Sequence, residues 1–185
     1  MSTAHRNNGP PREARSPLRL YVLIGLAAAL FGALILPRLG ARLEGGFAPD
    51  FALPVLSGGE PGARVRLSEQ RGRPVLLDFW ASWCGPCKAQ TKVLEAFVNS
   101  AAGKGFVVLG VNVNDDPAAA QRYLASVRPS WIVVGDSEGT IGSAYQVQQL
   151  PTLVLIDRAG RIFTIRRHFM SEGELSALVA GMGSQ

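Results

Sequence analysis

The two cysteines of the 185-residue chain constrain its fold more than any other feature. Cys84 and Cys87 lie in the stretch WASWCGPCK, and a run of mainly apolar residues before them, Pro74–Trp80, predicts a buried strand. Within Lys88–Ala102, apolar residues then follow at helical spacing, namely Leu94, Phe97, Val98 and Ala101. The pair is therefore expected where a strand passes into a helix, which is a junction typical of α/β domains.

A helix N-terminus would give the two thiols different surroundings. Unpaired backbone N–H groups and the helix macrodipole favour negative charge there, which lowers the pKa of a thiol at that position. Cys84, the outer residue, is the expected nucleophile, and Cys87, one turn into the helix, is the expected resolving thiol. Gly85 allows a tight turn, and Pro86 suits the first helical turn because its missing N–H has no partner to lose.

A pair of cysteines at this spacing can serve in three ways. A structural disulfide between Cys84 and Cys87 would close a very short loop and constrain little of the unfolded chain. A structural zinc site would need two more ligands, and the chain has only two histidines, His5 and His168. Thiol–disulfide exchange benefits from close spacing, because the second thiol must resolve the mixed disulfide quickly. The pair therefore predicts redox chemistry without a metal or another cofactor.

The N-terminal region predicts a membrane anchor. Residues 1–19 form a polar basic tail, and Leu20–Leu36 is an uncharged apolar run, short but sufficient for a span. A cleaved signal peptide is the alternative, although the best cleavage site contains Leu39 where a small residue is needed. The positive-inside rule places the N-terminus in the cytoplasm and the domain outside it, in the periplasm, on a single-pass inner-membrane protein. Residues 37–46 are expected to be a linker and residues 47–185 the folded domain.

Charge argues against a nucleic-acid partner. The net charge of +5 comes from the first 42 residues, which contain six arginines and one acid, Glu13. The remaining residues hold 13 basic and 13 acidic side chains, so the domain itself is neutral. It therefore lacks the basic surface excess that binding to a phosphate backbone usually requires.

The other elements predict a mixed sheet between helices, because strands alternate with helices first and a hairpin closes the domain. Asp116 is expected to cap a helix that begins at Pro117, and Ser171–Glu174 forms a capping box before the last helix. The predicted strands after the cysteines are Phe106–Val113, Trp131–Val134, Thr152–Ile156 and Arg161–Phe169. The inward stripe of the last helix is Leu175, Leu178, Val179 and Met182. Trp80 and Trp131 are read as core residues.

The stretch VLLDFWASWCGPCK resembles thioredoxin, and about residues 47–182 resemble the membrane-anchored, extracytoplasmic thioredoxin-like oxidoreductases of the TlpA/ResA/CcmG type. Phe47–Pro54 and Val65–Leu77 are similar to an N-terminal extension and lead-in strand that those proteins share with peroxiredoxins. Gln149–Ile162 resembles their cis-proline segment, and Asp116–Tyr145 resembles their central insertion. The resemblance implies a thioredoxin-like α/β fold with a mixed sheet flanked by helices, preceded by one transmembrane helix.

The resemblance also implies roles for single residues. Pro151 would be cis and face the cysteines, which would leave the backbone of Leu150 free to pair with an extended substrate. Asp78 matches the buried acid of thioredoxin and would relay a proton for Cys87, with a pKa raised by burial. Trp83 would form part of the substrate-contacting rim, together with Gly85 and Pro86. The implied partners are disulfide-containing proteins, a thiol-type electron donor in the membrane, and lipid around the anchor.

The sequence departs from this family at three points. Gln90 stands where many relatives have an acid, Lys92 stands where proline is usual, and Phe106–Val113 lacks the lysine that thioredoxin places near its acid. The Gly-Pro dipeptide favours a reducing protein by analogy, with cytochrome c maturation or oxidase assembly among the settings in which relatives act. Two alternatives on the same fold stay open, a thiol peroxidase and a copper-handling chaperone that would use His168.

Overall fold

A computed structural model describes residues 21–27, 30, 43–60 and 62–182. The chain divides into two compact units, Met1–Ala41 and Arg42–Gln185. In the first unit, residues 21–27 are helical. Most of the expected anchor Leu20–Leu36 and all of the basic tail lie outside the described residues.

Across the described part of the chain, no helix combines the length and the apolar character that crossing a bilayer requires.

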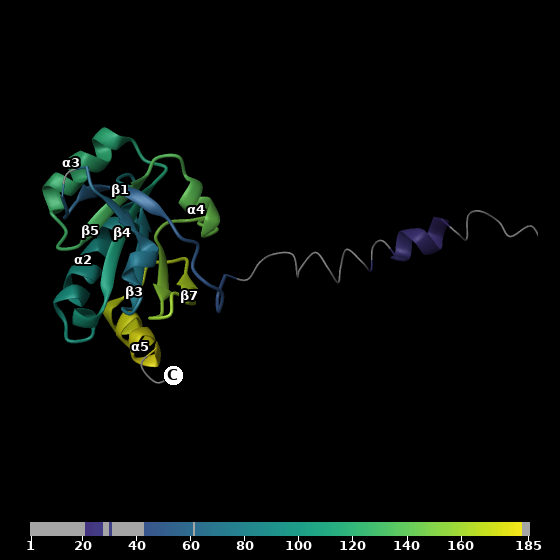
Figure 1. The fold of residues 1–185 in the computed structure, drawn as a ribbon. Helices are drawn as coiled ribbons and strands as arrows, with labels where there is room; N and C mark the ends of the chain where they lie inside the picture. The colour runs from purple at the N-terminus through teal and green to yellow at the C-terminus, as the bar shows by residue number, and fades with distance from the viewer. Residues whose placement is uncertain (1–20, 28–29, 31–42, 61, 183–185) are drawn as a thin grey trace, which may run out of the picture. The chain divides into compact units, whose positions relative to one another are not determined.

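The second unit is built on one seven-stranded mixed sheet with the order β2-β1-β5-β4-β3-β6-β7 (Figure 1). The strands are β1 (Ala52–Ser57), β2 (Arg64–Arg66), β3 (Val75–Trp80), β4 (Val107–Val113), β5 (Ile132–Asp136), β6 (Thr152–Ile156) and β7 (Ile162–Arg166). The helices are η1 (Leu67–Gln70), α2 (Gly85–Asn99), η2 (Gly103–Gly105), α3 (Pro117–Val127), α4 (Thr140–Ala144) and α5 (Glu172–Met182). β3, β4 and β5 are parallel, whereas β1, β6 and β7 pair antiparallel with their neighbours. This is the expected thioredoxin-like α/β fold.

The sheet separates two apolar cores, because successive side chains of a strand point to opposite faces. Leu76 and Trp80 belong to the core beneath α2, α3 and α5, which also contains both cysteines. Leu77 and Phe79 belong to the core on the other face, against which α4 packs (Figure 1). All six residues of β3 are buried, so β3 is the buried strand that the apolar run predicted. Trp80 and Trp131 are core residues, as expected, at 4% and 7% exposure.

Several helix boundaries follow the predicted caps. Asp116 accepts a hydrogen bond from the Ala119 amide (2.7 Å) and begins α3, and Ser171 and Glu174 exchange the bonds of a capping box at α5. The helix that begins at the cysteines, α2, has Pro86 in its first turn, as expected, and ends at Asn99. The predicted helical position of Ala101 is therefore wrong, because Ala101 lies beyond the end of the helix and is exposed.

Residues 43–46, the described part of the range 37–46 that the sequence predicted as a linker, are hydrogen-bonded to the folded unit. The Glu44 carboxylate accepts hydrogen bonds from the Ile165 amide (2.7 Å) and the Thr164 hydroxyl (3.0 Å). The Gly45 amide donates to the Ile162 carbonyl (2.7 Å), and the Ile162 amide donates to the Gly46 carbonyl (2.8 Å). These bonds satisfy the outer edge of β7, which would otherwise present unpaired backbone groups.

Candidate active site

Three segments meet at one edge of the sheet. β3 runs parallel to β4 and antiparallel to β6, so the ends of β3 and β4 and the start of β6 share that edge. The segments there are residues 81–84, residues 114–116 and residues 149–151. The first of them leads into α2 and carries the cysteines, as the sequence predicted.

Cys84 and Cys87 form a disulfide with an S–S distance of 1.98 Å and a Cα–Cα distance of 5.3 Å. Cys84 is the N-cap of α2, and its Sγ accepts a hydrogen bond from the Cys87 amide at 3.2 Å. Gly85 and Pro86 are the first two residues of α2, so Pro86 lies in the first helical turn, as expected. A sulfur at this place lies beside the unpaired amides of the first turn, which stabilise a thiolate once the disulfide is reduced.

Both cysteines are buried in the disulfide, with exposed fractions of 5% for Cys84 and 1% for Cys87. Burial of Cys87 agrees with its expected place one turn into the helix, whereas Cys84, expected as the outer residue, is not exposed. Cys84 packs into the core beneath α2, because its backbone N–H is tied to the Ala81 carbonyl (3.1 Å) as the chain leaves β3. The exposed residues of this turn are instead Trp83, Gly85 and Pro86.

A carboxylate that the sequence analysis did not single out holds the turn before Cys84. Asp115 accepts hydrogen bonds from the Ser82 amide (2.5 Å) and the Ser82 hydroxyl (2.7 Å). The Asn112 side chain donates to the same carboxylate at 2.8 Å. The contact joins residues 33 positions apart, and it forms because β3 and β4 end side by side. Only the parallel pairing of the two strands could have indicated it.

Trp83 lies on the rim of the site, as the resemblance implied. Its side chain is 64% exposed, and its indole N–H donates to the Asn114 carbonyl at 3.0 Å. The Leu150–Pro151 bond is cis, also as expected. Leu150 is half-buried and Pro151 is buried, directly before β6. The structure thus brings Trp83, Leu150 and Pro151 to the edge of the sheet that carries the disulfide.

Asp78 is buried in the middle of β3, with 2% of its surface exposed. It pairs with Gly110 of β4 and Leu153 of β6, and its side chain points to the same face as Leu76 and Trp80, beneath the cysteines. No described residue donates a hydrogen bond to its Oδ1 atom. Burial raises the pKa of this carboxyl to about 7, because the charged form loses its hydration.

Gln90 joins α2 to the start of α5. Its side chain is fully buried, its Oε1 accepts from the Met170 amide (2.8 Å), and its Nε2 donates to the Met170 carbonyl (3.3 Å). A carboxylate here could not donate to that carbonyl, so the amide suits this structural contact. Lys92 is exposed on α2, and His168 is exposed after β7.

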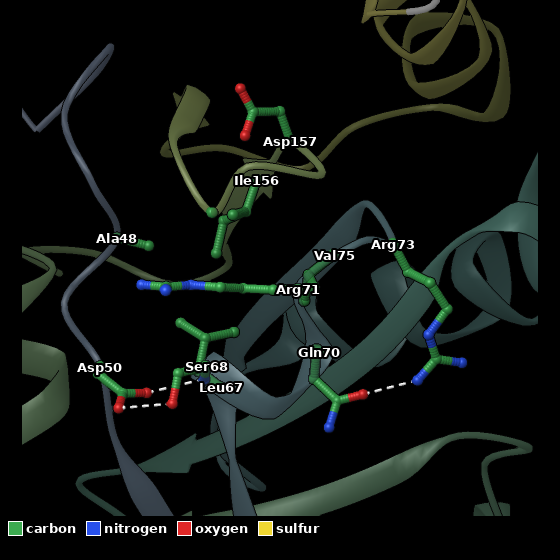
Figure 2. Close-up of a pocket in the computed structure, with 11 residues that line it drawn as sticks. Ala48, Asp50, Leu67, Ser68, Gln70, Arg71, Arg73, Val75, Ile156 and Asp157 are labelled. Atoms are coloured by element: carbon green, nitrogen blue, oxygen red, sulfur yellow. Dashed lines mark hydrogen bonds between the residues drawn. The ribbon is translucent and has the colours of Figure 1, made fainter.

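The described residues contain no group of three or more His, Cys, Asp or Glu side chains placed to hold a metal ion. A small pocket lies at the opposite end of β3 from the cysteines (Figure 2). It is lined by Val75, where β3 begins, Ile156, where β6 ends, and Arg71, whose side chain extends across it (Figure 2). This pocket is therefore separate from the redox site.

The fold and the site together define a class: a thioredoxin-like domain whose paired cysteines cycle between dithiol and disulfide. The Redoxin family model matches residues 43–181, and the chain belongs to that family. Its Cys84–Cys87 pair is that of a thiol-disulfide oxidoreductase.

Named relatives agree with this class. The chain is 35% identical over 149 residues to the thiol:disulfide interchange protein DsbE of Pseudomonas fluorescens biotype C, covering 79% of each chain. It is 28% identical over 158 residues to the thiol-disulfide oxidoreductase ResA of Bacillus subtilis, covering 85% of this chain and 86% of that one. A solved structure described as a DsbE interchange protein of Chlorobium tepidum matches with a TM-score of 0.67 and 34% identity, over 75% of this chain and 96% of that chain.

Proposed function

We propose that this protein reduces disulfides of partner proteins outside the cytoplasm, held at the inner membrane by Leu20–Leu36. The observation that carries the redox part is the Cys84–Cys87 disulfide placed at the N-terminus of α2. The uncharged run Leu20–Leu36 and the arginines before it support the membrane location and the orientation. Electrons would come from a membrane protein with a thiol pair.

The reductive half-cycle uses both sulfurs. The Cys84 thiolate attacks one sulfur of a substrate disulfide, the other substrate sulfur leaves as a thiolate, and a mixed disulfide forms. Cys87 loses its proton and attacks Cys84 Sγ, which releases the second substrate thiolate. Two electrons pass to the substrate, and the Cys84–Cys87 disulfide seen in this structure results. A dithiol donor then reduces that disulfide by the same exchange.

Asp78 is the proposed proton acceptor for Cys87. Its carboxyl faces the core that contains both cysteines, and its pKa of about 7 lets it gain and lose a proton near neutral pH. Asp78 is the ionisable residue of β3 on this face of the sheet. The neutral Gln90 side chain is bound to Met170, and Phe106–Val113 contains no lysine, so neither supplies another proton acceptor there.

An extended substrate strand would pair with the backbone of Leu150, next to Pro151. Exposed backbone groups can donate hydrogen bonds to, and accept them from, an extended chain that is added beside them. Trp83, Gly85 and Pro86 provide the exposed surface on the other side of the disulfide. Cytochrome c maturation and oxidase assembly are the settings in which we propose to look for the substrate.

Two measurements test the redox part of this function, and a third tests the anchor. The equilibrium between Cys84–Cys87 and glutathione should give a reducing potential, whereas a strongly oxidising value would indicate a disulfide donor instead. A Cys87→Ser variant should retain substrates covalently on Cys84, and a Cys84→Ser variant should retain few, because it lacks the attacking thiol. For the anchor, a mature protein that begins near residue 42 and is freely soluble would contradict the proposal.

A further inference from the structure

The arginines of the domain are unevenly distributed, although its total charge is balanced. Arg71, Arg73, Arg158 and Arg161 all lie at the end of the sheet opposite the disulfide, before β3 and in the turn between β6 and β7. The Gly72 amide donates to the Arg158 carbonyl (2.9 Å), which joins these two segments. All four side chains are exposed. We call these arginines, together with Phe47, the basic face.

The charges of the basic face are not neutralised by ion pairs. Among the described residues, none of its four arginines has a carboxylate oxygen within 4.0 Å, whereas Arg66 nearby lies 3.6 Å from Asp50. The two carboxylates that line the adjoining pocket are occupied by local hydrogen bonds. Asp50 accepts from Ser68 (Figure 2). Asp157 accepts from two amides of its own turn, those of Ala159 and Arg161.

An exposed aromatic ring completes the face. Phe47 is 59% exposed, and the Arg161 guanidinium lies 4.2 Å from the centre of its ring. The backbones of Phe47 and Arg161 form a β-bridge, and the Ala48 amide donates to the Gly160 carbonyl (2.9 Å). Arginines beside an exposed aromatic side chain are typical of protein surfaces at the headgroup level of a bilayer.

We propose that the basic face binds anionic phospholipid headgroups of the bilayer that holds the chain. This inference rests on the anchor in the proposed function. Only six residues separate Leu36 from Leu43 in the sequence, and two of them are Arg38 and Arg42. Guanidinium groups bind phosphate oxygens with two parallel hydrogen bonds, and anionic surfaces attract clustered arginines. Because the disulfide follows the opposite end of β3, lipid binding at this face leaves the cysteines facing the aqueous phase.

The test uses the full chain, oxidised, in vesicles of phosphatidylglycerol or of phosphatidylcholine that carry a nitroxide on some headgroups. With Cys84–Cys87 closed, a fluorophore is attached to a third cysteine, introduced as Ala159→Cys on the basic face or Ala118→Cys near the disulfide. Quenching at position 159 should be roughly twofold or more stronger in the anionic vesicles. It should fall to the phosphatidylcholine level in about 1 M salt. Position 118 should show no such difference.

Two charge-matched variants complete the design. Arg73→Gln with Arg158→Gln should abolish the lipid dependence, whereas Lys92→Gln with Arg122→Gln, which removes two charges elsewhere, should leave it intact. Equal quenching in both lipids, or lipid dependence that survives the first variant, would overturn the proposal. Resistance to carbonate extraction reports the anchor separately. If the chain is extracted, flotation with the same vesicles and variants tests the basic face without the anchor.

Discussion

At the residue scale, the two sulfurs differ in their place on α2. Cys84 caps the helix and Cys87 lies within its first turn at 1% exposure. We predict that Cys84 in a Cys87→Ser variant reacts with iodoacetamide at lower pH and faster than Cys87 in a Cys84→Ser variant, by about tenfold near neutral pH. Alkylation rates measured from pH 5 to 10 check this. Faster reaction of Cys87 would reverse the assigned roles.

Asp78 should make the protein less stable as pH rises. Its folded pKa of about 7 is above its ordinary value of 3.8, so between these values the unfolded chain releases a proton that the folded protein keeps. The free energy of unfolding should therefore fall from about pH 4 to pH 7, by at most on the order of 4 kcal/mol. Urea unfolding of the oxidised protein at pH 5 and pH 8 measures the fall, and Asp78→Asn should remove most of it. An unchanged pH slope in this variant would show that Asp78 is not responsible.

The Asp78 carboxyl should also affect the rate at which the mixed disulfide is resolved. If Asp78 accepts the Cys87 proton, the release of substrate from the mixed disulfide should accelerate with pH through about 7, and Asp78→Asn should slow it by roughly 10²-fold or more. The initial attack by Cys84 should change little, because the helix terminus determines its thiolate. Stopped-flow measurement of the two steps separates them, and equal slowing of both would contradict the assignment.

Single residues could be predicted from the sequence when their role lies in a local motif. The cysteine pair at a helix N-terminus follows from the local sequence pattern. The cis bond at Pro151 and the buried Asp78 follow from the resemblance to thioredoxin-like proteins. Gln90 could not be interpreted this way, because its partner Met170 is 80 positions away. What the sequence shows as a departure from relatives is, in the structure, a pair of hydrogen bonds between α2 and the backbone of Met170, two residues before α5.

At the scale of elements, the turn between β3 and α2 is held from outside by the end of β4. Asp115→Ala would leave the Ser82 amide and hydroxyl without their acceptor, which costs about 1–3 kcal/mol. We predict a loss of stability in this range together with a several-fold change in the alkylation rate of reduced Cys84. Asp116→Ala is the matched control, because it removes only the cap of α3. It should lower stability similarly and leave Cys84 reactivity unchanged, so equal effects on reactivity would contradict a positioning role for Asp115.

Elements with strong periodicity were predicted well, and their boundaries less so. β3 and β6 are fully buried, so runs of mainly apolar residues indicated them. The end of α2 is decided by Ser100, whose hydroxyl donates to the Phe97 carbonyl (2.6 Å) and accepts from the Gly103 amide (3.1 Å). These side-chain hydrogen bonds compete with the backbone bonds that would continue the helix, so the helix stops before Ala101. Apolar spacing alone carries no information about this competition.

At the scale of the whole domain, the structure separates two surfaces along the length of β3. The disulfide and its exposed rim, Trp83, Gly85 and Pro86, follow the end of the strand. The basic face, with Arg71 and Arg73, precedes its beginning. Total charge could be predicted from composition, but this arrangement could not, because it depends on the β6–β7 turn coming to lie beside residue 72.

Residues 44–46 determine where a truncated protein can begin without losing its contacts to β7. A version that starts at residue 47 would lose Glu44, Gly45 and Gly46, and with them the bonds to Thr164, Ile165 and Ile162. The backbone groups at the outer edge of β7 would then be unpaired and could pair with a strand from another molecule. We predict that this version self-associates at concentrations where one starting at residue 43 stays monomeric. Light scattering would distinguish the two proteins, and if both were monomeric, residues 44–46 would not be needed to prevent self-association.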